Sequence, residues 1–367
     1  MRVCYFGTYS VGGGYPRNTV LMDALRAAGA TVHECHAPLF ADAHEKVAAA
    51  KGGLRFAGRL ARAWASLTRQ YRRAPAHDVV VVGYTGHLDI QLARLVARGR
   101  PIVLDAFLSP WDTVVRDRQL FPERSLRSRA LFAAERSALR RADKVLTDTT
   151  AHADYMARTF GVDRAKFHAI PVGSIMPVPA LVGRPGPEPH RPLRAFFCGS
   201  FVPLQGVPVI LDAAAQAPEI EFEIVGDGPG ADRIEEEVAA RAMPNVRLER
   251  RFIDRGELAA RTEAADVVLG VFGDGDKTGR VVPCKVYDGL AAGKPVVTGD
   301  GAAPRAMLRD GEEALLVRRG DAAAIVEALR RLQDPELRAR LADGARRAYE
   351  ARFSIEAIGR TLKEALA

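Results

Sequence analysis

The sequence predicts an α/β protein with two Rossmann-like, doubly wound parallel-sheet domains that face each other across a cleft. Three observations predict this fold. Strand-like and helix-like segments alternate along the chain, the two halves open with one shared pattern, and a proline-rich stretch divides them. A chain of 367 residues is long enough for two domains with separate cores.

The shared opening is a strand, a glycine turn and a helix. Residues 2–9 (RVCYFGTY) and 194–201 (RAFFCGSF) each have an arginine, four strand-like residues, a glycine, a hydroxyl residue and an aromatic. Helix patterns follow at 18–28 and 207–217. The first opening continues through Gly12, Gly13 and Gly14. Glycines at a strand end let a ligand approach the backbone, so we assign these three to donor binding.

Further strands are expected wherever short apolar runs are bounded by turn residues. In the first half these runs are 30–34, 78–83, 101–105, 144–148 and 171–174. In the second half they are 220–225, 246–250, 267–272, 295–298 and 314–317. Because helical stretches separate these runs, both sheets are predicted to be parallel.

The domain boundaries follow from this pattern. Residues 1–175 form the first domain, and residues 176–192, with six prolines, form a linker that cannot be a regular element. Residues 193–345 form the second domain. A helix over 346–367 is expected to follow it, with packing against the first domain as one option.

Composition sets limits on function and compartment. The chain is 48% hydrophobic and 27% charged, as in ordinary globular proteins. No apolar stretch reaches the roughly 18 residues that span a bilayer, and the opening residues predict a strand rather than a leader. Four widely spaced cysteines lack metal-ligand spacing, so we expect free thiols and no metal. We expect a cytoplasmic protein, and the alanine- and arginine-rich composition is typical of a GC-rich bacterial genome.

The net charge of +8 is concentrated in residues 51–73, which hold seven cations and no acid. An aromatic and aliphatic stripe recurs there at helical spacing. Three interpretations stay open. The helix packs on its domain with its cations in water, it contacts an anionic membrane on the inner face, or it meets an acidic acceptor. Nucleic acid binding is not expected, because no recognition module accompanies the charge.

Residues 266–300 carry the strongest functional signal. A buried strand is followed by a glycine–aspartate loop, then by Lys277, Arg280 and Lys285, and then by a helix that Pro283 can open. Cations beside a helix N-terminus suit a phosphate ester, through backbone N–H groups, the helix dipole and fixed charge. Asp288 lies three residues after Lys285, on one helical face, where a carboxylate could accept sugar or ribose hydroxyls.

A second glycine turn, 226–229, follows a strand and precedes a helix. It lacks the full dinucleotide fingerprint. A tight strand-to-helix turn and a nucleotide-binding turn therefore remain equal alternatives for Gly226.

The second half resembles the nucleotide-sugar domain of retaining glycosyltransferases, family 4 of the glycosyltransferase-B fold. The matching motifs, in order, are 197–200 with 205–206, 224–229, 257–258, 265–267, 288–297, 311 with 314–317, and 349–353. The first half is similar through its glycine loop and through residues 171–173. The resemblance implies transfer of a sugar from a nucleoside-diphosphate donor to an acceptor hydroxyl, with retained configuration and no metal cofactor.

Two departures from the family pattern concern the donor phosphates. The family holds the diphosphate with an arginine and a lysine in the loop after the first strand of this domain, where this chain has Ser200 and Gln205. The family also carries two glutamates seven residues apart, where this chain has Arg280 and Asp288. We expect the cations to have moved, with Lys277, Arg280 or both replacing the missing pair.

The candidate site combines both halves. Catalytic candidates are Asp105 and His87, each at a strand end of the first half where the family places a histidine near the sugar ring, and Arg280. The donor-binding set is Gly12, Gly13, Gly14, Gly199, Ser200, Gln205, Gly226, Arg251, Lys277, Arg280, Lys285 and Asp288. Two alternatives stay open beside the transferase: a sugar-nucleotide epimerase of the same fold, and a catalytically silent nucleotide-sugar binder that supports a partner.

Overall fold

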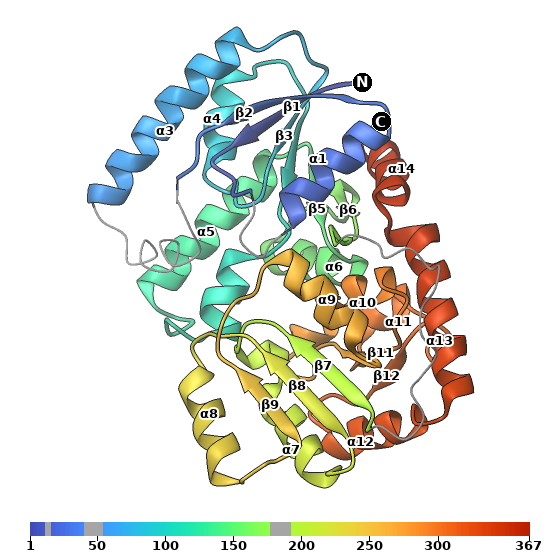
Figure 1. Ribbon diagram of the computed structural model, residues 1–367. Coiled ribbons are helices and arrows are strands. Elements are labelled where there is room, and N and C mark those ends of the chain that lie inside the picture. The colour runs from blue at the N-terminus through green and yellow to red at the C-terminus, as the bar shows by residue number, and fades with distance from the viewer. Residues whose placement is uncertain (12–15, 40–53, 177–191) are drawn as a thin grey trace. The chain divides into compact units, whose positions relative to one another are not determined.

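The computed structural model describes residues 1–11, 16–39, 54–176 and 192–367, with the side chains of the third range from residue 56 onward. These residues form two compact units (Figure 1). The first comprises Met1–Gly173 and Ile355–Ala367, and the second comprises Ser174–Ser354. Gly12, Gly13, Gly14 and almost all of the predicted linker lie outside the described residues.

The first unit is a six-stranded parallel sheet covered by helices. Its strands are β1 (Arg2–Gly7), β2 (Thr31–His36), β3 (Val79–Val82), β4 (Ile102–Asp105), β5 (Lys144–Thr147) and β6 (Phe167–Ala169), in the order β2-β1-β3-β4-β5-β6. Its helices are α1 (Arg17–Ala27), α3 (Leu54–Arg73), α4 (Asp89–Val96), α5 (Leu126–Arg141), α6 (Thr150–Phe160) and α14 (Ile355–Leu366), with short turns η1 (Asp112–Asp117) and η2 (Arg164–Lys166).

The strand order fixes which helices share a face. Crossovers between parallel strands are right-handed, so the single leftward step, from β1 to β2, places α1 on one face. All later steps run the other way and place α3, α4, α5 and α6 on the opposite face. The last helix, α14, lies beside α1 (Figure 1). The chain re-enters the first unit at Ile355, nine residues later than the boundary expected at 346.

One predicted strand is wrong. Residues 171–174 have no regular structure, and the sixth strand is Phe167–Ala169 instead. The backbone N–H of Ile170 still donates to Thr147 O, but the next residue, Pro171, has no N–H to continue the ladder.

The second unit has the same architecture, with another six-stranded parallel sheet. Its strands are β7 (Arg194–Cys198), β8 (Glu221–Val225), β9 (Val246–Glu249), β10 (Val267–Leu269), β11 (Val296–Gly299) and β12 (Leu315–Val317), in the order β12-β11-β10-β7-β8-β9. Its helices are α7 (Val207–Gln216), α8 (Ala231–Ala240), α9 (Arg255–Ala264), α10 (Cys284–Ala291), α11 (Ala302–Met307), α12 (Ala322–Arg331) and α13 (Pro335–Ala348), with η3 (Pro203–Gln205), η4 (Thr278–Arg280) and η5 (Tyr349–Phe353).

Each unit has its own apolar core between its sheet and its helices. The strands contribute continuous apolar runs because helices cover both faces of a parallel sheet. Val79–Val82, for example, is buried at all four positions. In both units the strand order reverses once, between β1 and β3 and between β7 and β10. Ligands of such sheets bind beyond the carboxyl ends of the strands at this reversal.

Candidate functional site

In the second unit, the loops that leave β7 and β10 are joined by their backbones. Phe272 N donates to Gln205 O at 3.1 Å, and Gly273 N donates to Leu204 O at 3.3 Å. Gly206 makes this approach possible. Its φ is +68°, and a Cβ there would lie 2.4 Å from Gly273 N. The two loops therefore form one surface at the point where the strand order reverses.

Lys285 reaches this surface from the first turn of α10. Its Nζ donates to Gln205 Oε1 at 2.5 Å and lies 3.5 Å from the centre of the Phe197 ring. Gly199 leaves the space for the ammonium group, because a Cβ at that position would be 2.6 Å from Nζ. The predicted residues Gly199, Gln205 and Lys285 are thus brought together, although up to 86 positions separate them in sequence.

The Lys285 amine is buried without a carboxylate. Only 8% of the residue is exposed, and none of its contacts among the described residues is an ion pair. Burial lowers its pKa to about 7, although Cys198, Cys284 and Asp288 partly oppose the shift. α10 begins after Pro283 with no side-chain cap. A buried amine beside an uncapped helix N-terminus favours an anionic ligand.

Asp288 lies one turn further along α10. Its Oδ1 accepts a hydrogen bond of 2.6 Å from Ser174 Oγ, whose oxygen also accepts from Met176 N. Burial raises the pKa of Asp288 to about 7, and the Ser174 hydrogen bond opposes this shift. Near neutral pH the Asp288 carboxyl group is therefore present in two forms. The ionised form accepts hydrogen bonds from hydroxyl groups, and the protonated form can also donate one.

Lys277 precedes the short turn η4 between β10 and α10, and Arg280 ends this turn. Lys277 is buried and Arg280 is half-buried. Next to them, the guanidinium of Arg319 donates to Gly275 O at 2.6 Å and packs against Gly279. Lys277 and Arg280 therefore lie on the β10–α10 connection, and Lys285, in the first turn of α10, contacts the β7 loop.

The glycine turn after β8 packs against the β7 loop of the same unit. Phe201 N donates to Asp227 O at 2.9 Å, and a Cβ on Gly226 would lie 1.9 Å from Gly199 O. Close packing of protein backbone accounts for Gly226, which favours the tight-turn interpretation of this motif. Ser200 lies half-buried in the loop that this turn supports.

Arg251 and Asp105 have protein partners instead of facing a ligand. Arg251 pairs with Glu249 and Glu257 in an exposed network. Asp105 is fully buried, and Arg17 Nε and Nη2 donate to it at 3.0–3.1 Å. Arg17 therefore holds the Asp105 carboxylate inside the core, with no exposed surface for a ligand. We leave both residues out of the proposed site.

His87 is the stronger candidate in the first unit. It follows β3 at the reversal of strand order, where Asn18 Nδ2 donates to both Ser10 O and Tyr84 O and so fixes the neighbouring loops. His87 is 8% exposed, and within the described chain neither ring nitrogen has a hydrogen-bond partner. Burial lowers its pKa to about 4, so the imidazole is neutral at physiological pH.

The sequence analysis missed three side-chain contacts that join distant segments of the chain. Ser174 supports Asp288 over 114 positions, and Arg17 neutralises Asp105 over 88. Cys4 and Cys35, 31 positions apart in the sequence, lie on neighbouring strands with their sulfur atoms 3.6 Å apart as free thiols. No sequence signal links these residues, because adjacent strands and crossing helices create each contact.

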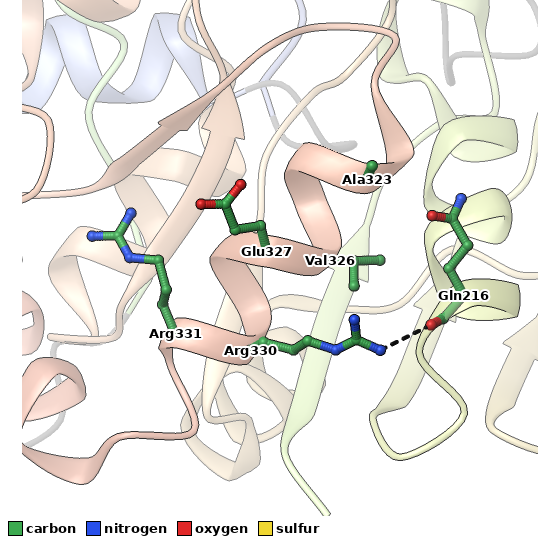
Figure 2. Close-up of a pocket in the computed structure, with 6 residues that line it drawn as sticks. All are labelled: Gln216, Ala323, Val326, Glu327, Arg330 and Arg331. Atoms are coloured by element: carbon green, nitrogen blue, oxygen red, sulfur yellow. Dashed lines mark hydrogen bonds between the residues drawn. The ribbon is translucent and has the colours of Figure 1, made fainter.

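An open hollow of about 730 Å³ lies elsewhere, between the end of α7 and α12 (Figure 2). It is lined by Gln216, Ala323, Val326, Glu327, Arg330 and Arg331. Gln216 ends α7, whereas the β7 loop precedes that helix, so the hollow is near the opposite edge of the sheet. We assign it no role in donor binding.

The described residues contain neither a metal-binding cluster nor a membrane-spanning helix. No group of three or more histidine, cysteine, aspartate or glutamate side chains is arranged to hold a metal ion. No helix in the same part of the chain has the length and apolar character needed to cross a membrane.

Comparison with known families identifies the class of protein. Residues 192–334 match the family described as "Glycosyl transferases group 1", and residues 6–173 match the "Glycosyl transferase 4-like domain". The chain therefore belongs to the group 1, family 4-like glycosyltransferases, which confirms the resemblance seen in its motifs.

Individual relatives agree with this assignment. The chain is 28% identical over 221 residues to a 2-deoxystreptamine N-acetyl-D-glucosaminyltransferase of Streptomyces fradiae, covering 55% of this chain and 50% of that protein. It is 32% identical over 170 residues to a phosphatidyl-myo-inositol mannosyltransferase of Mycobacterium leprae, covering 44% and 42%. The match thus spans about half the length of these relatives.

Solved structures confirm the glycosyltransferase-B fold. Anabaena Alr3699/HepE in complex with UDP-glucose has a TM-score of 0.71 at 17% identity, covering 100% of this chain and 99% of that one. Sucrose-phosphate synthase from Thermosynechococcus elongatus has a TM-score of 0.72 at 19% identity, covering 100% and 98%. At such identities the likeness shows the fold alone.

Proposed function

We propose that this protein transfers a sugar from a nucleoside-diphosphate donor, a uridine diphosphate sugar, to an acceptor hydroxyl, with retained configuration and without a metal ion. Family membership supports the reaction class. The similar fold of a protein solved with UDP-glucose supports the uridine donor. The relatives' names specify different acceptors, so the proposal goes no further than a hydroxyl. The free thiols fit a cytoplasmic protein.

The observation that carries the proposal is the buried amine of Lys285 at the loop after β7. The amine has no carboxylate partner among the described residues, so the buried site lacks a counter-ion. A diphosphate would supply two negative charges there. In this proposal Lys285 and the N-terminus of α10 stabilise the charge that develops on the departing diphosphate. Asp288 accepts a hydrogen bond from a hydroxyl group of the nucleotide sugar, and Lys277 and Arg280 contribute further positive charge.

His87 is the proposed group on the first unit. A neutral imidazole with two buried, unpartnered nitrogens can donate to one ligand oxygen and accept from another. Removing it by His87→Ala should lower the rate of transfer while leaving donor affinity within about twofold, because the donor phosphates are assigned to the second unit.

The test is a panel of uridine, guanosine, thymidine and adenosine diphosphate sugars. Thermal shift reports donor binding, and release of nucleoside diphosphate reports turnover. Slow donor hydrolysis, unchanged by EDTA, supports the transferase. Conversion of the sugar without release of nucleotide would indicate an epimerase, and binding without turnover would indicate a silent binder. A sample that binds none of the donors would refute the proposal.

Variants then test the residues. Lys285→Met should weaken donor binding about 10- to 100-fold, the usual loss for a charge-assisted hydrogen bond. Lys294→Met is the matched control. It removes the same charge beyond the other end of α10, where Lys294 Nζ donates to Glu263 O and Ala265 O. Lys277→Ala and Arg280→Ala, each without effect on affinity and turnover, would remove those two residues from the proposal.

A further inference from the structure

The N-terminal turn of α6 holds a second buried imidazole of the first unit. The helix follows β5 (Figure 1), and His152 lies in its first turn, just beyond the carboxyl end of that strand. The backbone N–H of His152 donates to the Thr149 cap at 3.1 Å, and the ring Nδ1 lies 2.8 Å from Asp148 Oδ1. Because both the backbone and the ring are held, the imidazole is fixed in one orientation.

The other ring nitrogen of His152 has no hydrogen-bond partner. An ionised Asp148 carboxylate can only accept, so Nδ1 carries the proton and Nε2 presents its lone pair. Nε2 is buried, and within the described chain no group donates to it. Tyr155, one turn further along α6, donates its hydroxyl proton to Asp112 Oδ1 at 2.7 Å. A buried acceptor without a hydrogen bond is costly, and a ligand hydroxyl can remove that cost.

The charges next to this imidazole can accommodate one more proton. The buried ion pair of Arg17 and Asp105 lies at the end of β4, the neighbouring strand. Burial raises the pKa of Asp105, and the nearby charge of Asp148 adds to this rise. When they are ionised, these three groups carry one positive and two negative charges. A proton on His152 Nε2 brings the sum of the four charges to zero.

His152 lies at the same edge of the first sheet as His87. His87 follows β3, His152 follows β5, and β4 lies between these two strands. Neighbouring strands are about 4.8 Å apart, so the two imidazoles follow strands that are roughly 10 Å apart. Ligands of such sheets bind at this edge. The spacing leaves room for an acceptor group beside a donor sugar that contacts His87.

Two other groups at this edge are poor proton acceptors. Burial lowers the pKa of His87 to about 4, and no carboxylate bonds to its ring. Asp105 is occupied, because Arg17 Nε and Nη2 both donate to it. His152 differs from both, since Asp148 stabilises its protonated ring and its second nitrogen carries a lone pair without a partner in the described chain.

We propose that His152 is the base that takes the proton of the acceptor hydroxyl, and that Asp148 is its positioning residue. This role rests on the proposed sugar transfer. As the hydroxyl oxygen bonds to the anomeric carbon, its proton moves to His152 Nε2. The bond from that carbon to the phosphate oxygen breaks, and its electron pair leaves with the nucleoside diphosphate. The imidazolium then releases the proton to water. The contact between Nε2 and the hydroxyl forms in the substrate complex.

The variant His152→Asn separates this role from a structural one. An asparagine amide can take the place of Nδ1 and donate to Asp148, but it leaves nothing in the place of Nε2. His77→Asn is the matched control. His77 is also buried, but it precedes β3 at the opposite edge of the sheet, where its nitrogens contact Tyr71 and Pro75. If thermal unfolding shows that His152→Asn is not folded, His152→Gln takes its place.

The assay is hydrolysis of the uridine diphosphate sugar that the thermal-shift panel selects, with water as the acceptor. We expect kcat to fall at least about 100-fold in His152→Asn, as is usual for loss of a general base, with donor affinity within about twofold. His77→Asn should keep kcat within about twofold. The ratio of wild-type to His152→Asn rates should shrink toward low pH, because a protonated Nε2 accepts no further proton. Titrations of Lys285 and Asp288 cancel in this ratio.

Three results would overturn the role of His152. A rate for His152→Asn within about threefold of wild type would show that Nε2 takes no part in the reaction. Equal losses in His152→Asn and His77→Asn, or a rate ratio that does not change with pH, would indicate a structural effect. A wild-type protein that releases nucleotide from none of the donors would refute the transfer reaction, and the base with it. Wild-type turnover that His152→Asn leaves unchanged would refute the base alone.

Discussion

Replacing Lys285 with methionine should stabilise the ligand-free protein and at the same time weaken donor binding. Burial lowers the pKa of Lys285 from 10.5 to about 7. Each tenfold change in a protonation equilibrium corresponds to about 1.4 kcal/mol, so burying this amine destabilises the folded state by about 5 kcal/mol below pH 7, where the amine is charged, and by about 4 kcal/mol at pH 7.5, where it is mostly neutral. Methionine fills a similar volume and removes that cost.

Part of the stability that Lys285→Met gains is lost again at Gln205. Gln205 Oε1 accepts its hydrogen bond from Lys285 Nζ, and leaving a buried acceptor unpaired costs about 1–3 kcal/mol. The expected net increase in the free energy of unfolding is therefore about 1–3 kcal/mol at pH 7.5. For a unit of this size, this corresponds to a rise in Tm of several degrees, at about 2–4 °C per kcal/mol.

The sign of the pH dependence follows from the direction of the shift. The folded-state pKa of about 7 lies below the unfolded value of 10.5, so between them the unfolded chain binds a proton that the folded chain has lost. The Lys285 contribution therefore makes wild-type stability rise with pH across this window. The advantage of the variant is largest below pH 7 and disappears toward pH 10.5.

Donor binding changes in the opposite direction. A bound diphosphate favours the charged amine, so above pH 7 wild-type binding takes up a proton and affinity falls, at most about tenfold per pH unit. Lys285→Met lacks this contribution. Calorimetric titration in two buffers of different ionisation enthalpy measures the proton uptake, and thermal unfolding from pH 6 to 10 measures stability. A methionine variant that is less stable than wild type, or that binds donor equally well, would refute the reasoning.

Two further predictions concern structural residues. Asp105→Asn should lower stability by about 3–5 kcal/mol, because Arg17 stays buried with its charge uncompensated; urea unfolding measures this, and a loss below about 1 kcal/mol would contradict it. Gly206→Ala should destabilise by more than about 2 kcal/mol, since an alanine at positive φ would also meet Gly273 N. Gly311→Ala is the control, with φ of +74° and nothing within 4 Å of an added Cβ, and a similar loss for both variants would contradict the clash.

The sequence predicted most of the fold because the strands of these sheets are buried on both faces. Runs such as Val79–Val82 and Val296–Gly299 read as strands without knowledge of their neighbours. The repeated opening likewise indicated where each sheet turns into its first helix. The strand predicted at residues 171–174 is wrong because that prediction gave more weight to the apolar residues than to the missing N–H of Pro171.

The candidate site was only partly predictable, because sequence shows where a residue lies along a strand but not which group faces it. The sequence analysis assigns both Asp105 and Asp288 to the candidate site, Asp105 at a strand end and Asp288 on a helix. One is neutralised by Arg17 inside the core, and the other is supported by Ser174 at the start of α10. Each partner comes from a distant segment, so the difference in role arises from tertiary placement.

Positive charge reaches the β7 loop from α10. The family resemblance predicts an arginine and a lysine in this loop, and the chain has Ser200 and Gln205 instead. The structure brings Lys285 Nζ to within 2.5 Å of Gln205 Oε1, at one of these positions. In our proposal, one lysine has therefore moved from the loop to the helix, and the glutamine now orients it.

Exchanging the two residues tests this relocation directly. Gln205→Lys with Lys285→Met returns the cation to the loop and should recover at least about tenfold of the donor affinity that Lys285→Met loses. Gln205→Lys alone should lower stability, because two ammonium groups would meet where one now lies against Gln205 Oε1. Donor titration of both single variants and the double variant forms a complete cycle. Additive losses would show that the two positions do not share one charge, and the relocation would then be wrong.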